Sequence, residues 1–262
     1  TDDENNVGII ILQNGDVIND VFEEGARTRI YGFNATEGDQ VTIKMTQVDD
    51  LDPFLVLLGP RGEVIAQDDD GGEVNLSSEI QVTLPSSGGY LIFASTFFAI
   101  TTVLDSDVEG VSGFELSIEG ITAPTDLDDF DPMTIAYFSG TAPVGGSTEG
   151  SSTLQEPVFY YTLEAEEGQV YDITLESDDF DTVLHVFGQN GDRIAVNDDD
   201  PLGSTTDSAI TDLVIPVTGK YVIFATDLFF YNAIATEIDE ESVLNYSGGT
   251  FTLTISEPTL AK

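Results

Sequence analysis

Aspartates are grouped before and after one apolar stretch in each half of the sequence, and carboxylate oxygens are the ligands that Ca²⁺ prefers. The groups are Asp49, Asp50 and Asp52 with Asp68, Asp69 and Asp70, then Asp178, Asp179 and Asp181 with Asp198, Asp199 and Asp200. A strand and hairpin of this length return the chain close to its starting point. The spacing therefore predicts that the two groups of each half meet and bind Ca²⁺.

Calcium suits such a cluster because it accepts about six to eight hard oxygen ligands. A bound cation also offsets the repulsion that raises the pKa of neighbouring carboxyl groups. Sodium and magnesium fit less well, and the EF-hand spacing fails because Gly72 stands where a third ligand belongs. Solvated turn residues are the alternative interpretation, which the sequence leaves open.

Cysteine and histidine, which often carry out nucleophilic and acid–base catalysis, are absent or rare in this chain. The chain has no cysteine, and its one histidine, His185, occupies the position that Val56 holds in the other half. A Ser-His-Asp arrangement would need this histidine, and the Gly-x-Ser-x-Gly elbow is absent. Carboxylate pairs for glycoside cleavage are numerous, but nothing marks one as a catalytic acid. We predict that the protein is not an enzyme.

Aromatic residues follow a predicted strand in each half and open a long connection. They are Phe97 and Phe98 in the first half and Phe229, Phe230 and Tyr231 in the second. Long connections in compact domains are often functional, so these residues are candidate partner-binding positions. Continuation of the strand into the core is the alternative.

The charge balance excludes several partners. Seven Lys and Arg residues stand against 49 Asp and Glu, which gives a formal net charge of -42. Nucleic acid and anionic membranes would be repelled, and no apolar run reaches the roughly 20 residues that span a bilayer. Such acidity requires surrounding cations, as in a calcium-containing extracellular medium or a hypersaline one. The start at Thr1, without Met or an apolar leader, predicts a mature secreted form, and a piece excised from a longer chain is the alternative.

The sequence is internally duplicated in four blocks that recur in the same order. YGFNATEGDQVTIKM lies over YTLEAEEGQVYDITL, DPFLVLLGPRGEVIAQDDD over DTVLHVFGQNGDRIAVNDD, LPSSGGYLIFAST over IPVTGKYVIFATD, and GFELSIEG over TFTLTISE. A segment rich in Pro and Asp separates the copies. We predict one domain over residues 1–122, a linker over 123–132 and a second domain over 133–262.

Each copy has the two-residue periodicity of half-buried strands, with Gly, Asn and Asp clusters between the runs. Apolar Val41, Ile43 and Met45 alternate with polar neighbours, as do Tyr171, Ile173 and Leu175. The expected fold is all-β, with two tandem antiparallel jelly-roll-like β-sandwich domains.

These blocks resemble the bacterial pre-peptidase C-terminal domain, which is similar to the collagen-binding domains of collagenases. The shared pattern is a strand with Tyr, x-G-x-x-V/Y-x-I, D-x-x-L-x-L/V-x-x-x-x-G, an Asp cluster, P-x-x-G-x-Y-x-I/V and F-x-L-x-I, and both halves contain it. The resemblance implies a non-catalytic sandwich of secreted enzymes, sometimes calcium-binding, that contacts a substrate or matrix.

Two functions follow as hypotheses. The first is an extracellular structural protein, stabilised by calcium, that assembles with itself as a surface or filament subunit or with a matrix polymer. The strand from Val7 to Leu12 offers a route to assembly by strand addition to a neighbouring copy, although pairing within its own sheet is the commoner arrangement. The second is a substrate- or matrix-binding accessory module of a secreted hydrolase.

Overall fold

A computed structural model gives the structure of the chain. It describes residues 9–22, 27–48, 51–73, 76–97, 111–122, 138–153, 156–199, 205–229, 231, 246 and 248–261. The predicted linker over residues 123–132 lies outside these ranges.

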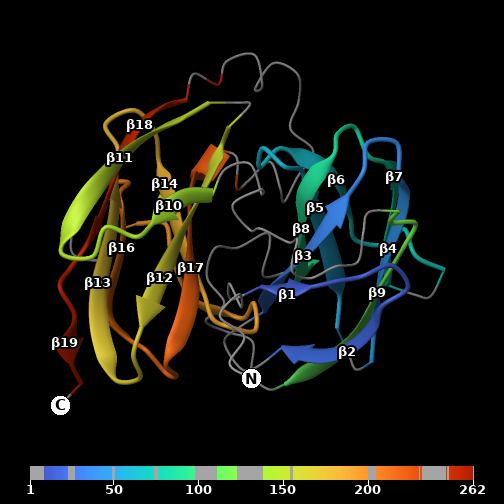
Figure 1. Ribbon diagram of the computed structural model, residues 1–262, viewed down its shortest axis with the longest axis horizontal. Coiled ribbons are helices and arrows are strands. Elements are labelled where there is room, and N and C mark those ends of the chain that lie inside the picture. The colour runs from blue at the N-terminus through green and yellow to red at the C-terminus, as the bar shows by residue number, and fades with distance from the viewer. Residues whose placement is uncertain are drawn as a thin grey trace. The chain divides into compact units, whose positions relative to one another are not determined.

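The chain forms two compact units, each a β-sandwich (Figure 1). The first module contains β1 (Ile10–Ile11), β2 (Val17–Phe22), β3 (Thr28–Ala35), β4 (Gln40–Gln47), β5 (Pro53–Leu58), β6 (Val64–Asp68), β7 (Ser78–Thr83), β8 (Gly88–Thr96) and β9 (Ser112–Glu119). The second module contains β10 (Phe138–Thr141), β11 (Gly146–Ser152), β12 (Val158–Ala165), β13 (Gln169–Glu176), β14 (Thr182–Phe187), β15 (Arg193–Asn197), β16 (Ser208–Val214), β17 (Gly219–Asp227), β18 (Gly249–Ile255) and β19 (Thr259–Leu260).

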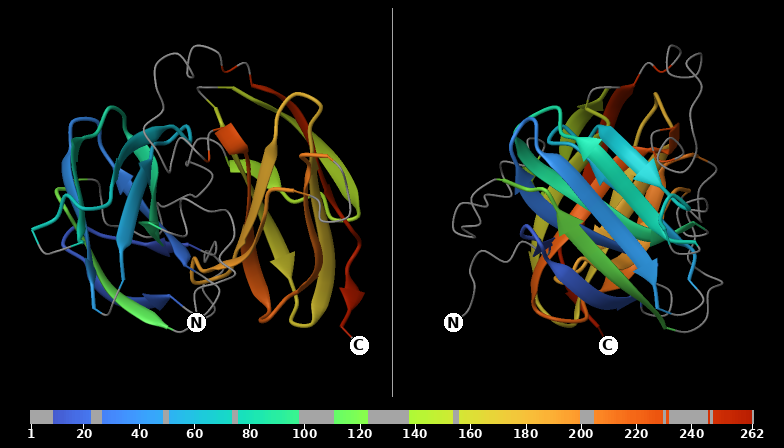
Figure 2. Two further views of the ribbon diagram at one scale, coloured as in Figure 1. Left: turned by 180° about the vertical axis from the view of Figure 1, so that it is seen from behind. Right: turned by 90° about the vertical axis from the view of Figure 1, so that its right-hand side faces the viewer.

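The two modules share one topology. In the first, a five-stranded sheet β1-β3-β8-β5-β6 packs on a four-stranded sheet β2-β9-β4-β7, whose strands lie side by side in the right-hand view of Figure 2. In the second, β10-β12-β17-β14-β15 and β11-β18-β13-β16 repeat these orders, and β19 adds to β13. Figure 1 shows these two sheets as the layers of the second module. The all-β sandwich prediction is confirmed.

One edge of each five-stranded sheet departs from the expected antiparallel pairing. β1 runs parallel to β3, with Ile10 opposite Tyr31, and β10 runs parallel to β12. The described part of the Val7 to Leu12 strand thus pairs within its own module, whereas Val7 and Gly8 lie outside the described residues.

Alternating side chains build the core between the sheets. Val41, Ile43 and Met45 on β4 are buried, and the residues between them are partly exposed. β5 is buried at every position, as its continuous apolar sequence predicts, and β14 is equally buried although it contains Thr182 and His185. The β3–β4 and β12–β13 turns contain Gly38 and Gly168, whose φ angles of 92° and 81° favour glycine.

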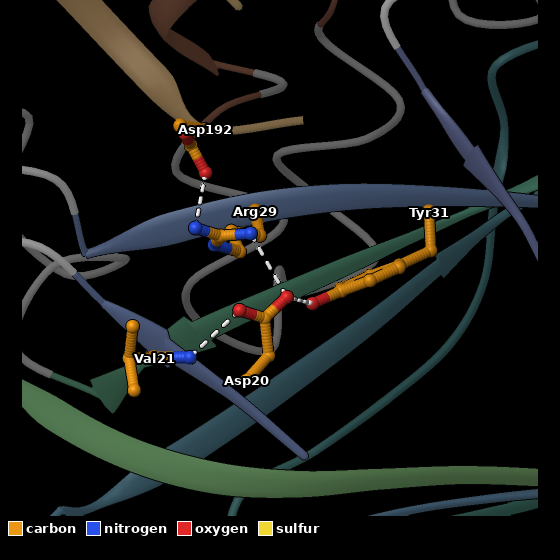
Figure 3. A network of polar contacts seen from close by, with 5 residues as sticks. All are labelled: Asp20, Val21, Arg29, Tyr31 and Asp192. Atoms are coloured by element: carbon orange, nitrogen blue, oxygen red, sulfur yellow. Dashed lines mark hydrogen bonds and ion pairs between the residues drawn. The ribbon is translucent and has the colours of Figure 1, made fainter. Parts of the chain in front are cut away.

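A polar network joins the two sheets of the first module (Figure 3). Oδ2 of Asp20 on β2 accepts hydrogen bonds of 2.8 Å from Nη1 of Arg29 and from the Tyr31 hydroxyl, both on β3. Asp192, which belongs to the same compact unit, forms an ion pair with Arg29 Nη2 at 2.6 Å. Burial and the Asp20 carboxylate raise the pKa of Tyr31 well above its ordinary value, so the hydroxyl remains a donor.

In the second module, aromatic side chains pack at the place that corresponds to this polar network. The block alignment and strand register put Gly150 opposite Phe251 where the first module pairs Asp20 with Phe114. Phe159 stands at the position of Arg29 and packs edge-on against Phe251, with ring centroids 4.7 Å apart. A Cβ on Gly150 would lie 2.1 Å from the Phe251 ring, so glycine is required there.

We expect Asp20→Ala to lower the free energy of unfolding of the first module by about 1–3 kcal/mol, because Arg29 and Tyr31 each lose a buried acceptor. Asn19→Ala, at the exposed neighbouring position, should change it by less than about 0.5 kcal/mol. Urea denaturation of both variants measures the difference. Equal losses would contradict a bridging role for Asp20.

Candidate functional site

The two aspartate groups of the first module approach each other at the open end of the β5–β6 hairpin. Asp52 precedes β5, and Asp69 and Asp70 follow β6. The Ser78 hydroxyl donates to the carbonyls of Pro53 at 2.8 Å and Asp69 at 3.0 Å, which holds the two ends of the hairpin together. Burial, and then the charges of Asp70 and Asp69, raise the pKa of Asp52.

The second module repeats this arrangement around Asp181. Asp181 precedes β14, and Asp198 and Asp199 follow β15. Burial raises the pKa of Asp181 to about 6, followed by the charges of Asp199, Asp198 and Asp227. Oδ1 of Asp181 is buried without a hydrogen-bond partner among the described residues. This oxygen is therefore available to a cation.

The Asp68 carboxylate accepts hydrogen bonds from the backbone. Its Oδ2 accepts backbone N–H bonds from Gly71 at 2.8 Å and Glu79 at 2.7 Å. Asn197 occupies the corresponding place in the second module, and its Oδ1 accepts the N–H of Ala209 at 2.7 Å. Since a neutral amide serves equally there, the role of this position is to tie the end of the hairpin to the next strand.

The group before β14 is divided between two surroundings. Oδ2 of Asp179 accepts the backbone N–H of Thr250 at 2.9 Å and its hydroxyl at 3.1 Å, which anchors the segment to β18. Asp178 is exposed. Asp49, Asp50 and Asp200 lie outside the described residues, and within the described ranges no three acidic or histidine side chains converge closely enough to hold a metal ion.

Asp227 was not among the predicted site residues. It ends β17 with no exposed surface, and its Oδ2 accepts hydrogen bonds from the hydroxyls of Tyr246 at 2.5 Å and Ser152 at 3.2 Å. The signal was present in the third repeated block, where Asp227 stands against Thr96. A charged residue in place of a neutral one at the end of a core strand marks a difference between the modules.

The aromatic candidates differ in exposure. Phe97 is 42% exposed, with its ring 6.2 Å from that of Phe54. Phe229 is partly buried and stacks on Tyr246, and Tyr231 is only 3% exposed and packs against His185. Phe98 and Phe230 lie outside the described residues. Among the described candidates, Phe97 presents the most ring surface to a partner.

His185 is a buried core residue. It is 1% exposed and lies against the rings of Phe187, Phe224 and Tyr231, with no hydrogen-bond partner for either ring nitrogen among the described residues. Burial, and then the Arg193 charge, hold the pKa of His185 well below its ordinary value, so the ring is neutral. A side chain in this position has no access to a substrate.

Comparison with known proteins agrees with the fold. Residues 27–95 match the family model of the bacterial pre-peptidase C-terminal domain. The chain is thus an all-β sandwich protein, and its residues 27–95 are similar to the pre-peptidase C-terminal domain. No curated protein matches the chain.

The solved structures to which the chain is similar include the following two. The pre-peptidase C-terminal domain of collagenase from Bacillus anthracis is 15% identical, with 42% of this chain and 94% of that chain covered and a TM-score of 0.34. A periplasmic inhibitor of g-type lysozyme from Aeromonas hydrophila is 19% identical, with 42% and 94% covered and a TM-score of 0.32. Among the described residues of our chain, no helix has the length and apolar character that crossing a membrane requires.

We expect Asp181→Asn to raise the melting temperature by about 2–4 °C at pH 7 in a chelator. An acid whose pKa in the folded state is raised, to about 6 against an ordinary value near 3.8, destabilises the fold above that pH and has no such effect below pH ~4. The gain should therefore disappear as the pH falls from 7 to 4.

The control is Asp212→Asn, which removes the same charge from an exposed position of the same module. Thermal scans over this pH range compare both variants with the parent, and the titration of His185 cancels because all three proteins share it. A gain for Asp181→Asn that is independent of pH, or that the control equals, would contradict the crowding of carboxylates around Asp181.

Proposed function

We propose that this chain is a non-catalytic extracellular binding protein, in which Ca²⁺ holds the aspartate groups at the hairpin ends and which assembles with itself or with a matrix. The observation that carries the proposal is that carboxylates without an ion-pair partner among the described residues lie near each other at the open end of the hairpin in both modules. Asp52 with Asp70, and Asp181 with Asp199, make no ion pair with the described residues, and the pKa values of Asp52 and Asp181 are raised.

The chemistry of these groups suits calcium. They supply hard, anionic oxygens, and the buried, unpartnered Oδ1 of Asp181 is a preformed acceptor. Bound calcium would remove the repulsion between the two ends of the hairpin. In the first module Asp52, Asp69 and Asp70 would contribute, and in the second Asp181, Asp198 and Asp199. Since no three described acidic side chains converge closely enough by themselves, backbone carbonyls and water would complete the coordination. Asp68 and Asp179 would keep their backbone partners instead.

Two features support assembly. The net charge of -42 makes association between copies depend on cations. β1 lies at the edge of its sheet, where a strand from another copy can add through backbone hydrogen bonds. An extracellular location supplies the calcium that both features need, and the pre-peptidase C-terminal match of residues 27–95 supports it.

Millimolar calcium should raise the melting temperature by at least about 3 °C over chelator, because a ligand that binds only the folded state stabilises it. Magnesium should do less. Asp52→Asn with Asp181→Asn should abolish the calcium shift, whereas Glu37→Gln with Asp212→Asn, an equal charge change at exposed positions, should retain it.

Light scattering on the same samples tests assembly. Particles much larger than one chain should appear with calcium and dissolve with chelator. Identical melting curves with and without calcium would refute the metal sites, and a monodisperse monomer at every calcium concentration would refute assembly.

The second candidate function is that of a binding module accessory to a secreted hydrolase. The exposure of Phe97, at 42%, favours it, since solvent-exposed rings are common anchors of binding surfaces. Phe97→Ala should then reduce retention on insoluble collagen or polysaccharide about tenfold. Val217→Ala, at a position 56% exposed, is the apolar control and should leave retention unchanged. Equal retention of both variants would exclude a role for this ring.

A further inference from the structure

A groove lies on the outward side of the four-stranded sheet β11-β18-β13-β16 of the second module. Its volume is about 730 Å³, within the range of roughly 300–1,000 Å³ that is usual for ligand sites. All of its lining residues are described and belong to the second module. Phe251 closes its inner side, but this ring is only 4% exposed.

The floor of the groove contains a row of three residues in register. Glu149 on β11 and Glu176 on β13 both pair with Thr252 on β18, so the two carboxylates flank one hydroxyl across three strands. Strands two apart in a sheet are roughly 10 Å from each other. The two glutamates are therefore spaced along the groove rather than gathered at a point.

The charged residues that line the groove are all acidic. Asp178 and Asp207 line it together with the two glutamates, and no Lys or Arg does. Asp207 accepts the backbone N–H of Ser177 at 2.9 Å, whereas the carboxylates of Glu149, Glu176 and Asp178 make no hydrogen bond or ion pair with the described residues. Hydroxyl groups of Ser151, Thr250 and Thr252 also line it. The groove thus presents unsatisfied negative charge beside neutral hydrogen-bonding groups.

The first module differs at the corresponding positions. Its row in register is Asn19 on β2, Glu115 on β9 and Thr46 on β4, so that one carboxylate stands between two neutral side chains. Thr46 also lines a hollow of only about 100 Å³, in which Lys44 forms a 3.2 Å ion pair with Glu79 on the next strand. The block alignment puts Thr174 at the position of Lys44, and Ala209 lies opposite Thr174 as Glu79 lies opposite Lys44.

Two further exchanges enlarge the contrast between the modules. Glu176 and Asp207 stand in the second module where the first has the neutral Thr46 and Ser77. In the register row the second module therefore has two glutamates on either side of a threonine, where the first has one glutamate between two neutral side chains. The neighbouring amine of Lys44 is also replaced, by Thr174.

Three other kinds of occupant fit less well. Glu149 and Glu176 lie on strands roughly 10 Å apart and do not converge on one point, which disfavours a single divalent ion. Sugar rings commonly stack on exposed aromatic side chains, and the one ring that lines the groove is buried. A second copy of the chain has seven basic residues against 49 acidic ones and offers little positive charge.

We propose that this groove binds an extended, basic segment of a partner protein, whose Lys or Arg side chains pair with Glu149 and Glu176 while its backbone bonds to the hydroxyl groups between them. Charge complementarity selects the partner, and the strand register sets the spacing of its basic side chains. The site is independent of the proposed calcium sites at Asp52 and Asp181.

The test uses the full chain and a fluorescein-labelled peptide Lys-Gly-Lys-Gly-Lys, with Ser-Gly-Ser-Gly-Ser as the neutral probe, at 0.15 M salt in chelator. Glu149→Gln with Glu176→Gln should weaken binding of the basic peptide about fivefold by fluorescence anisotropy. Glu166→Gln with Glu167→Gln removes the same charge at an exposed turn of the same module and should weaken it less than twofold.

A third variant copies the first module. Thr174→Lys places an amine beside Glu176 and should also reduce binding about fivefold, while Thr174→Gln should not. Amide shifts in NMR spectra should concentrate on Ser151, Ser177, Thr250 and Thr252. Equal weakening by both double variants, or equal binding of the neutral peptide, would overturn the proposal, and neither outcome depends on whether the chain binds calcium.

Discussion

The way in which the carboxylates of this protein are stabilised depends on its small number of basic residues. With seven basic residues for 49 acidic ones, most carboxylates must be stabilised by something other than a Lys or Arg of the same chain. Some accept backbone N–H groups, as Asp68 and Asp39 do. Burial alone would raise the pKa of Asp39, but hydrogen bonds from Thr122 and Thr36 bring it below its ordinary value. Others share a rare cation, as Asp20 shares Arg29. The remainder need a cation from outside.

That remainder is where function is expected. The carboxylates at the hairpin ends are crowded and partly buried, an arrangement that suits a compact hard ion. Those of the groove are exposed and spread over three strands, an arrangement that suits a longer basic ligand. The proposed calcium site at Asp181 and the proposed groove site belong to the same module and would take different ligands, because the spacing of their charges differs.

Because the two modules share one topology, equivalent positions can be compared directly. The polar bridge of Asp20, Arg29 and Tyr31 corresponds to rings packed over Gly150, and His185 corresponds to Val56. In each case the polarity of the side chain differs between the two modules, while the strand order is the same. Such exchanges are tolerated because the volume and register of the core are maintained, although its chemistry is not.

The all-β fold and the duplication are predictable from the sequence, because two-residue periodicity and ordered turn signals depend only on local residue types. The spacing of the aspartate groups, about one hairpin apart, is predictable for the same reason. The tertiary structure was needed to show that Asp68 is held by backbone N–H groups, that Tyr231 is buried and that Asp227 stands near Asp181. It alone aligned Glu149 with Glu176, since strands far apart in the chain become neighbours through sheet register, which local sequence does not encode.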